Sequence, residues 1–399
     1  MIRQMPTVGE SQRQPRIRAR LREGDRVMPL ELFFDLVFVL ALTQCTALMA
    51  DNPSWEGVGQ GLLVLGVVWW AWVGYSWLTS VVDPEEGAVR LVIFGAMAGM
   101  LIVALSAPEA FGDLGLVFAL ALGVVRTAHI GLFILADPSD AELRRSVIGL
   151  AMSTAVAVSL LALASLFDGA AQGALWALAL LLDMAGPYFI RPDGWRLEPE
   201  HFAERHGLIV IIALGESMVA IGIGAAGVLS LGIGMAAVLG VTLTAALWWA
   251  YFDIVALVSA RRLAAAEPGR IRNELARDSY SYIHLIMIAG VVLVALGLKE
   301  TLGHFDEELG SIHASALLGG VAAYLLGLVA FRYRHVRTIS RRRLLAAVVL
   351  LLLVPVAMEI PALAALGVVN VLVWVLIVLD TRSYGEGRHR VRHPDPTEA

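Results

Sequence analysis

Long apolar runs recur along almost the whole chain, and they limit its fold more than any other feature. An α-helix needs about 20 predominantly apolar residues to cross the hydrocarbon core of a bilayer. Twelve such runs lie at residues 29–50, 57–80, 87–107, 113–136, 144–167, 171–190, 202–224, 230–258, 278–300, 312–331, 342–362 and 366–381. Backbone polar groups in lipid must be satisfied within the segment, which favours helices. The sequence therefore predicts an all-α integral membrane protein with about twelve transmembrane helices.

Composition supports this fold class. Apolar residues make up 58% of the chain, charged residues 16%, and the mean hydropathy is +0.74. Soluble domains contain about 45–50% apolar and about 25% charged residues. The single cysteine, Cys45, excludes an intrachain disulfide and a cysteine-rich metal site. We therefore expect neither a metal nor a cofactor.

Several motifs of soluble and intramembrane enzymes are missing. The sequence contains no phosphate-binding GxxxxGK[ST] loop, so ATP-driven pumping by this chain alone has no support. It also contains no HExxH and no GxSxG motif of a hydrolase. These patterns argue against an enzyme without excluding one.

The basic residues predict the orientation of the helices. If the N-terminus is cytoplasmic, the loops after each even-numbered run and the C-terminal tail are cytoplasmic too. All but two of the 30 Lys and Arg residues then lie inside, and the exceptions are Arg126 and Lys299. This asymmetry follows the positive-inside rule and predicts that both termini are cytoplasmic.

Residues 1–28 form a basic N-terminal arm that lacks the apolar core and cleavage site of a signal peptide. The arm can be interpreted as a nucleic-acid contact or as a contact with anionic lipid headgroups. We favour the lipid, which is the nearer partner of a membrane protein, and expect no nucleic acid. Residues 382–399, rich in Arg, His and Pro, are predicted to be a disordered cytoplasmic tail.

The chain contains an internal repeat. LELFFDLVFVLALTQC at 30–45 aligns without a gap to FAERHGLIVIIALGES at 202–217, which places Gln44 opposite Glu216. WWAWVGY at 69–75 returns as WWAYFDI at 248–254, and AGMLIVALSAPEAFGD at 98–113 returns as AGVVLVALGLKETLGH at 289–304. The order of these matches predicts a duplicated helical bundle.

We expect two repeats, at 29–192 and 201–381, joined by a cytoplasmic linker at 193–200. Each repeat holds six runs, an even number, so both enter the membrane in the same sense. Parallel repeats of this kind are related by an axis along the membrane normal.

Charged residues inside apolar helices are costly and usually face a cavity or a partner. Glu31 and Asp35 are four residues apart on one face of the first helix. They either reach toward water and pair with loop arginines, or form a carboxylate pair that attracts cations or shares a proton.

The first helix of the second repeat carries a similar set. Glu204 and Arg205 can form an interfacial ion pair, and His206 follows them. Glu216 lies in the middle of an apolar run, opposite Gln44 in the repeat. We interpret Glu216 as a polar pathway group, with a structural hydrogen bond as the alternative.

Arg126 and His129 are the basic pair deepest in the predicted bundle. Arg126 requires an acid, and Asp183 lies at a compatible depth. This pair either locks helices together or binds substrate. Four further polar residues lie in the same inner third: Asp253, Asp278, His284 and Asp380. They are either satisfied structural groups or pathway groups, and a histidine there can shuttle protons.

Three segments carry a family resemblance. PLELFFDLVFVLALTQ, ERHGLIVIIALGES and YSYIHLIMIAGVVLVALGLK occur in this order along the chain. They resemble the bacterial low temperature requirement protein A (LtrA) family. The resemblance implies a multi-pass protein of the bacterial cytoplasmic (inner) membrane whose biochemical activity is poorly defined.

A second, fainter resemblance concerns the first helix. FFDLVFVLALT is similar to the FSD-x-VF-x-x-AL-T string that opens each repeat of a potassium channel family with six-helix repeats, whose first helices line the pore. The shared residues are Asp35, Val37, Phe38, Ala41, Leu42 and Thr43. Phe34 replaces the serine of that string, and Gly207 stands where the second aspartate would be.

Together these patterns predict a transporter without its own ATPase, for a small cationic or proton-coupled solute. Glu31, Asp35 and Glu216 would be pathway groups, with Arg126 and His129 as counter-charges. The alternatives are a cation channel, a membrane enzyme acting on lipid, or a scaffold linked to growth at low temperature. The expected partners are membrane lipid and the solute, and a homo-oligomer stays an open alternative.

Overall fold

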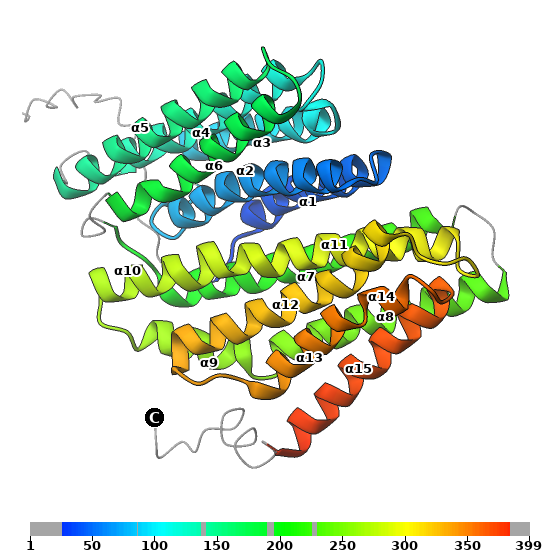
Figure 1. Cartoon of the computed structure of the whole chain (residues 1–399). Helices are drawn as coiled ribbons and strands as arrows, with labels where there is room; N and C mark the ends of the chain where they lie inside the picture. The colour runs from blue at the N-terminus through cyan, green and yellow to red at the C-terminus, as the bar shows by residue number, and fades with distance from the viewer. Residues whose placement is uncertain (1–25, 86, 137–140, 190–194, 226–229, 384–399) are drawn as a thin grey trace, which may run out of the picture.

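The protein is all-α, as predicted. The computed structural model describes residues 26–85, 87–136, 141–189, 195–225 and 230–383, and these residues form helices and short connections (Figure 1). The first half contains α1 (Pro29–Asp51), α2 (Trp55–Thr79), α3 (Gly87–Ser106), α4 (Gly115–Ala136), α5 (Ala141–Ala164) and α6 (Gly169–Phe189). The predicted basic arm and C-terminal tail lie almost wholly outside the described residues.

The second half begins with α7 and contains more helices because two of its apolar runs are interrupted. Its helices are α7 (Pro199–Gly224), α8 (Leu231–Phe252), α9 (Val255–Ala264), α10 (Arg270–Ala276), α11 (His284–Gly303), α12 (Ser311–Val336), α13 (Arg341–Leu352), α14 (Val354–Ala357) and α15 (Ala362–Ser383). A seven-residue π-helical segment, Arg277–Ile283, joins α10 to α11 without a break.

Eleven stretches of the described residues are long and apolar enough to cross a membrane. The chain is therefore a multi-pass membrane protein. The predicted run at 342–362 is not one continuous helix, because α13 ends at Leu352 and the short α14 carries Pro355 in its first turn. Proline lacks the N–H that a continuing helix needs, so the helical run is interrupted here.

Burial separates central helices from those that face lipid. In α2 and α12, 78% and 72% of the most apolar stretch is buried, against 28% in α5 and 22% in α6. The exposed apolar side chains of α5 and α6 are those expected to contact acyl chains. Most of the residues of the sites described below are buried in the interior of the bundle.

The two halves occupy different sides of the molecule, with α1–α6 on one side and α7–α15 on the other (Figure 1). Within the first half α1 packs on α2 and α3, and α3 packs on α4. Within the second half α7 packs on α8 and α11, and α11 packs on α12. Contacts of α1 and α2 with α7 and α11 join the halves.

The helices α1 and α7 run side by side in the same direction. Glu31 contacts His201 near the start of both helices, and Thr43 contacts Glu216 farther along both. Because contacting residues advance together along the two helices, the helices are parallel. Their shared face holds most of the charged residues singled out in the sequence.

Candidate functional site

The first part of the site is an ion-pair cluster between the N-terminal parts of α1 and α7. Arg205 donates from Nη1 to Glu31 Oε1 (3.0 Å) and from Nη2 to Asp35 Oδ1 (2.9 Å). His201 Nε2 lies 2.9 Å from the same Glu31 oxygen. The hydroxyl of Thr79 on α2 accepts a further hydrogen bond from Arg205. One guanidinium thus bridges both carboxylates.

Helix geometry explains this arrangement. Glu31 and Asp35 are one turn apart on α1, and His201 and Arg205 are one turn apart on α7, so each pair occupies one face of its helix. All four side chains are buried. Trp72 of α2 donates its indole N–H to Asp35 Oδ1 at 2.8 Å. The carboxylates are therefore held by the guanidinium of Arg205, the imidazole of His201 and the indole of Trp72, and they are buried.

A histidine–aromatic cluster, made of His206, Tyr251, Tyr280 and His284, lies next to Trp72. The ring of His206 is 5.0 Å from that of Trp72 and 5.4 Å from that of His284. Tyr251 on α8 is 2.9 Å from His284 Nε2. The Nδ1 atoms of both histidines lie within 3.0 Å of backbone carbonyls, which orients the two rings.

Glu216 occupies a different place, farther along the shared face of α1 and α7. Its carboxylate accepts a hydrogen bond of 2.5 Å from the hydroxyl of Thr43. The residue is buried, with 1% of its surface exposed. Lys299 of α11 acts on it electrostatically, but among the described residues no cation comes within ion-pair distance of Glu216. It is a buried acid held by a hydroxyl group.

Arg126 and Asp183 form the ion pair expected from the sequence. Arg126 Nη2 donates to both Asp183 oxygens, at 3.0 and 3.1 Å, and also to Thr154 on α5. Nη1 donates to the carbonyl of Trp70 on α2 at 3.2 Å. The Nε donor has no partner among the described residues. Arg126 therefore joins α2, α4, α5 and α6 and keeps one donor free.

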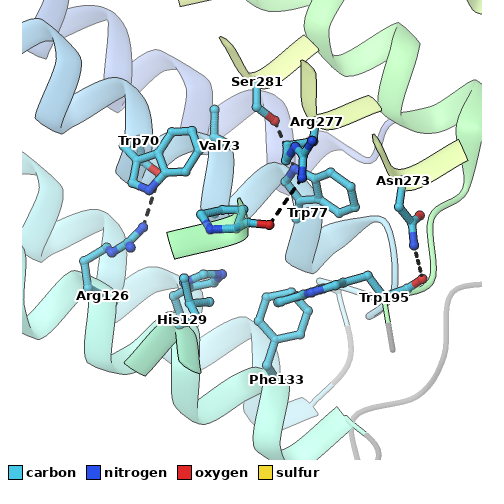
Figure 2. Close-up of a pocket in the computed structure, with 13 residues that line it drawn as sticks. Trp70, Val73, Trp77, Arg126, His129, Phe133, Trp195, Asn273, Arg277 and Ser281 are labelled. Atoms are coloured by element: carbon cyan, nitrogen blue, oxygen red, sulfur yellow. Dashed lines mark hydrogen bonds between the residues drawn. The ribbon is translucent and has the colours of Figure 1, made fainter. Parts of the chain in front are cut away.

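A cavity of about 80 Å³ opens beside Arg126 (Figure 2). By the measure in which one water needs about 10–15 Å³, it has room for several waters. Arg126 and His129 of α4 line one side, and Arg277 and Ser281 of the π-helical segment line the other. Aromatic rings complete most of the wall: Trp70, Trp77, Phe133 and Trp195. The cavity lies between the two halves of the protein.

Sequence comparison identifies the family. A family model described as bacterial low temperature requirement A protein (LtrA) matches residues 26–379. The chain belongs to this family. The resemblance noted in the three sequence segments is thereby confirmed. A relative in Rhizobium meliloti (strain 1021), the uncharacterized protein RA0937, is 30% identical over 376 residues, which are 88% of each chain. No solved structure matches the chain.

Three predicted site residues of this LtrA-family protein lie outside the clusters above. Glu204 is exposed and accepts a hydrogen bond from the backbone N–H of Val27 at 3.2 Å. The Glu204–Arg205 pair considered above is replaced by the pairs of Arg205 with Glu31 and Asp35. Gln44 is half-buried next to Thr43, and Asp253 is half-buried at the end of α8.

Sequence reasoning missed His201, Trp72 and Arg277. His201 had a detectable signal, because it precedes Arg205 by four residues on the same helical face. Trp72 and Arg277 had no detectable signal in the sequence, since their roles depend on contacts between distant helices. Among the described residues no group of three or more His, Cys, Asp and Glu side chains is arranged to hold a metal ion.

Proposed function

We propose that this LtrA-family protein is a transporter of the bacterial cytoplasmic membrane that has no ATPase of its own and couples a small solute to protons. We retain the predictions from the sequence that the bundle is duplicated and that both termini are cytoplasmic. Membership of the LtrA family and the multi-pass fold support the part of the proposal that concerns a membrane protein.

The observation that carries the proposal is the isolated carboxylate of Glu216. A carboxylate deep in a membrane protein is costly and is usually kept for a function. Glu216 has a hydroxyl partner, Thr43, and no ion-pair partner among the described residues. Uptake of a proton removes the cost of an unpaired ion in apolar surroundings. Glu216 is thus suited to alternate between two protonation states.

The other acids favour proton coupling over attraction of a cation. Arg205 bridges Glu31 and Asp35 and neutralises one of their two negative charges. An incoming cation would also meet Arg205 in their midst. In this proposal the ion-pair cluster holds α1 and α7 together, and Glu216 is the group that exchanges a proton.

A cation channel is the nearest alternative, because α1 and α7 are the first helices of the two halves and lie side by side. The ion-paired and buried side chains of Glu31, Asp35 and Arg205 lie between the first turns of these helices and oppose cation passage along this line. Single-channel currents faster than an alternating-access cycle would favour the channel.

Flux in proteoliposomes tests the proposal. The purified protein is reconstituted with an internal pH dye, and proton entry is followed under imposed pH gradients while Na⁺, K⁺ and small carboxylates are added in turn. We expect solute-dependent proton movement in the native protein. Glu216→Gln keeps the size of the side chain but removes the exchangeable proton, and should lower this movement by about tenfold or more, the scale on which an essential proton-transfer group acts.

Glu204→Gln is the matched control, since Glu204 lies on the same helix but is exposed. It should leave proton movement unchanged. Absence of solute-dependent proton movement under all these conditions, or equal rates for Glu216→Gln and the native protein, would rule the proposal out.

A further inference from the structure

We infer that the cavity lined by Arg126, His129 and Arg277 binds a small organic anion, a carboxylate that carries an apolar or aromatic group. This goes beyond the proposed transport, because binding can be measured without flux. The inference rests on the charge, the walls and the unsatisfied polar atoms of the cavity.

The charge of the lining is positive. Two guanidinium groups, those of Arg126 and Arg277, face the cavity, and no carboxylate belongs to the described residues that line it. Asp183 and Asp278 neutralise part of this charge from outside the cavity. Asp278 also pairs with Arg334, at 3.1 Å, so the Arg277–Asp278–Arg334 group carries a net positive charge.

Two residues that line the cavity also carry buried polar atoms without partners among the described residues. Arg126 keeps its Nε donor free. His129 is buried, and its ring nitrogens make no hydrogen bond of normal geometry with the described residues. Buried polar groups are usually satisfied, so each exception requires an explanation. Because these atoms have almost no accessible surface, a carboxylate bound here would accept hydrogen bonds from them only after a small shift of the two side chains.

The aromatic walls of the cavity favour an apolar group in the rest of the ligand. The indole rings of Trp70, Trp77 and Trp195 and the ring of Phe133 surround the polar groups. Phe133 and Trp195 meet edge to face at 4.9 Å, and Trp195 is fixed through its carbonyl by Asn273. Aromatic walls of this kind also suit organic cations, but two facing guanidinium groups would repel one. The sign of the charge therefore favours an anion with an apolar body.

Gly74 also lines the cavity and leaves room for the ring of His129, because it has no side chain. It lies on α2 opposite His129, and a Cβ atom placed there would be 2.7 Å from His129 Cε1. The side chain of any larger residue would displace the imidazole of His129, which lines the cavity. Gly131, on the same helix as His129, has open space around its Cβ position and provides a matched control.

Equilibrium binding of radiolabelled benzoate to the purified full-length protein in nanodiscs tests the inference. Benzamide and benzylamine, which have the same ring and a neutral or cationic group, serve as competitors. We expect benzoate to compete about tenfold better than either, since a hydrogen bond to a charged group contributes at least that factor. Equal or better competition by benzamide or benzylamine, or no benzoate binding, would refute the inference.

Two pairs of variants locate the site. Arg277→Gln should weaken benzoate binding by about tenfold, whereas Arg334→Gln should not, because both arginines pair with Asp278 but only Arg277 lines the cavity. Gly74→Ala should weaken binding and Gly131→Ala should not. Monodisperse elution and an unchanged melting temperature show that each variant is folded. Equal effects within either pair would place benzoate elsewhere and overturn the assignment.

Discussion

At the scale of single residues, the buried charges of the ion-pair cluster depend on one another. Arg205 is 1% exposed and serves Glu31 and Asp35 at once. Transfer of three ions into an apolar interior is costly, and their attraction offsets this cost only when every partner is present. The cluster therefore contributes more to the specific docking of α1 on α7 than to net stability.

Removal of Arg205 should consequently destabilise the protein strongly. Arg205→Gln leaves two buried carboxylates without their guanidinium, and we expect a loss of about 3–5 kcal/mol in the free energy of unfolding. Arg270→Gln is the control, because Arg270 pairs with Glu274 on the surface and is 71% exposed. The free energy of unfolding of Arg270→Gln should fall by no more than about 1 kcal/mol. Denaturant unfolding in detergent micelles measures both, and equal losses would contradict this account.

At the scale of helices, close contact between α11 and α12 depends on glycine. A Cβ atom at Gly290 would lie 2.6 Å from the carbonyl oxygen of Gly320, and one at Gly320 would lie 2.7 Å from that of Gly290. The two backbones approach closely because neither residue has a side chain, as at many helix contacts in membranes. This contact fixes α11 and, through it, the π-helical segment that lines the cavity.

A single methyl group should disturb this contact. Gly320→Ala places the methyl against the backbone of α11, and overpacking of this kind costs about 1–3 kcal/mol. Gly319→Ala, at the preceding residue of α12, meets open space and should not destabilise the protein. Melting temperatures in detergent compare the two. A Gly320→Ala variant as stable as Gly319→Ala would show that the helices can separate at little cost.

The π-helical segment also helps to join the two halves. Ser281 accepts hydrogen bonds from two indoles of α2, from Trp69 to its carbonyl (2.8 Å) and from Trp77 to its hydroxyl (3.1 Å). Such segments occur frequently at functional sites. Here one segment of seven residues does both: its Arg277 lines the cavity, and its Ser281 binds two indoles of α2.

At the scale of the whole molecule, the two halves use corresponding helices for corresponding contacts. The first helix of each half packs on its second and third apolar helices, α2 and α3 in one and α8 and α11 in the other. This correspondence supports the duplication, which stays a prediction, as does the orientation with both termini in the cytoplasm. Orientation matters for function, because it places the cavity beside Arg126 toward the cytoplasm.

Cysteine labelling in intact cells tests the orientation. The native Cys45 is fully buried and should not react. Asp306 lies in the exposed loop before α12 and Glu267 in the exposed loop before α10, at opposite ends of the bundle. We expect Asp306→Cys to react with a membrane-impermeant maleimide in intact cells, and Glu267→Cys to react only after permeabilisation. The reverse pattern would invert the predicted orientation.

The sequence by itself determined the fold class, because lipid leaves a long apolar run no stable alternative to a helix. It also showed which residues share a helical face, since the period of the helix places Glu31 with Asp35 and Arg126 with His129. The apolar pattern predicts one continuous span more than the described residues contain, because hydropathy does not register that Pro355 interrupts the run at 342–362. Only the tertiary structure decided which faces meet: Arg205 with both carboxylates of α1, Glu216 with a hydroxyl instead of a cation, and Arg277 with α4 across a cavity. Local periodicity carries no information about contacts between residues as far apart as Glu31 and Arg205, because such contacts depend on how all the helices pack at once.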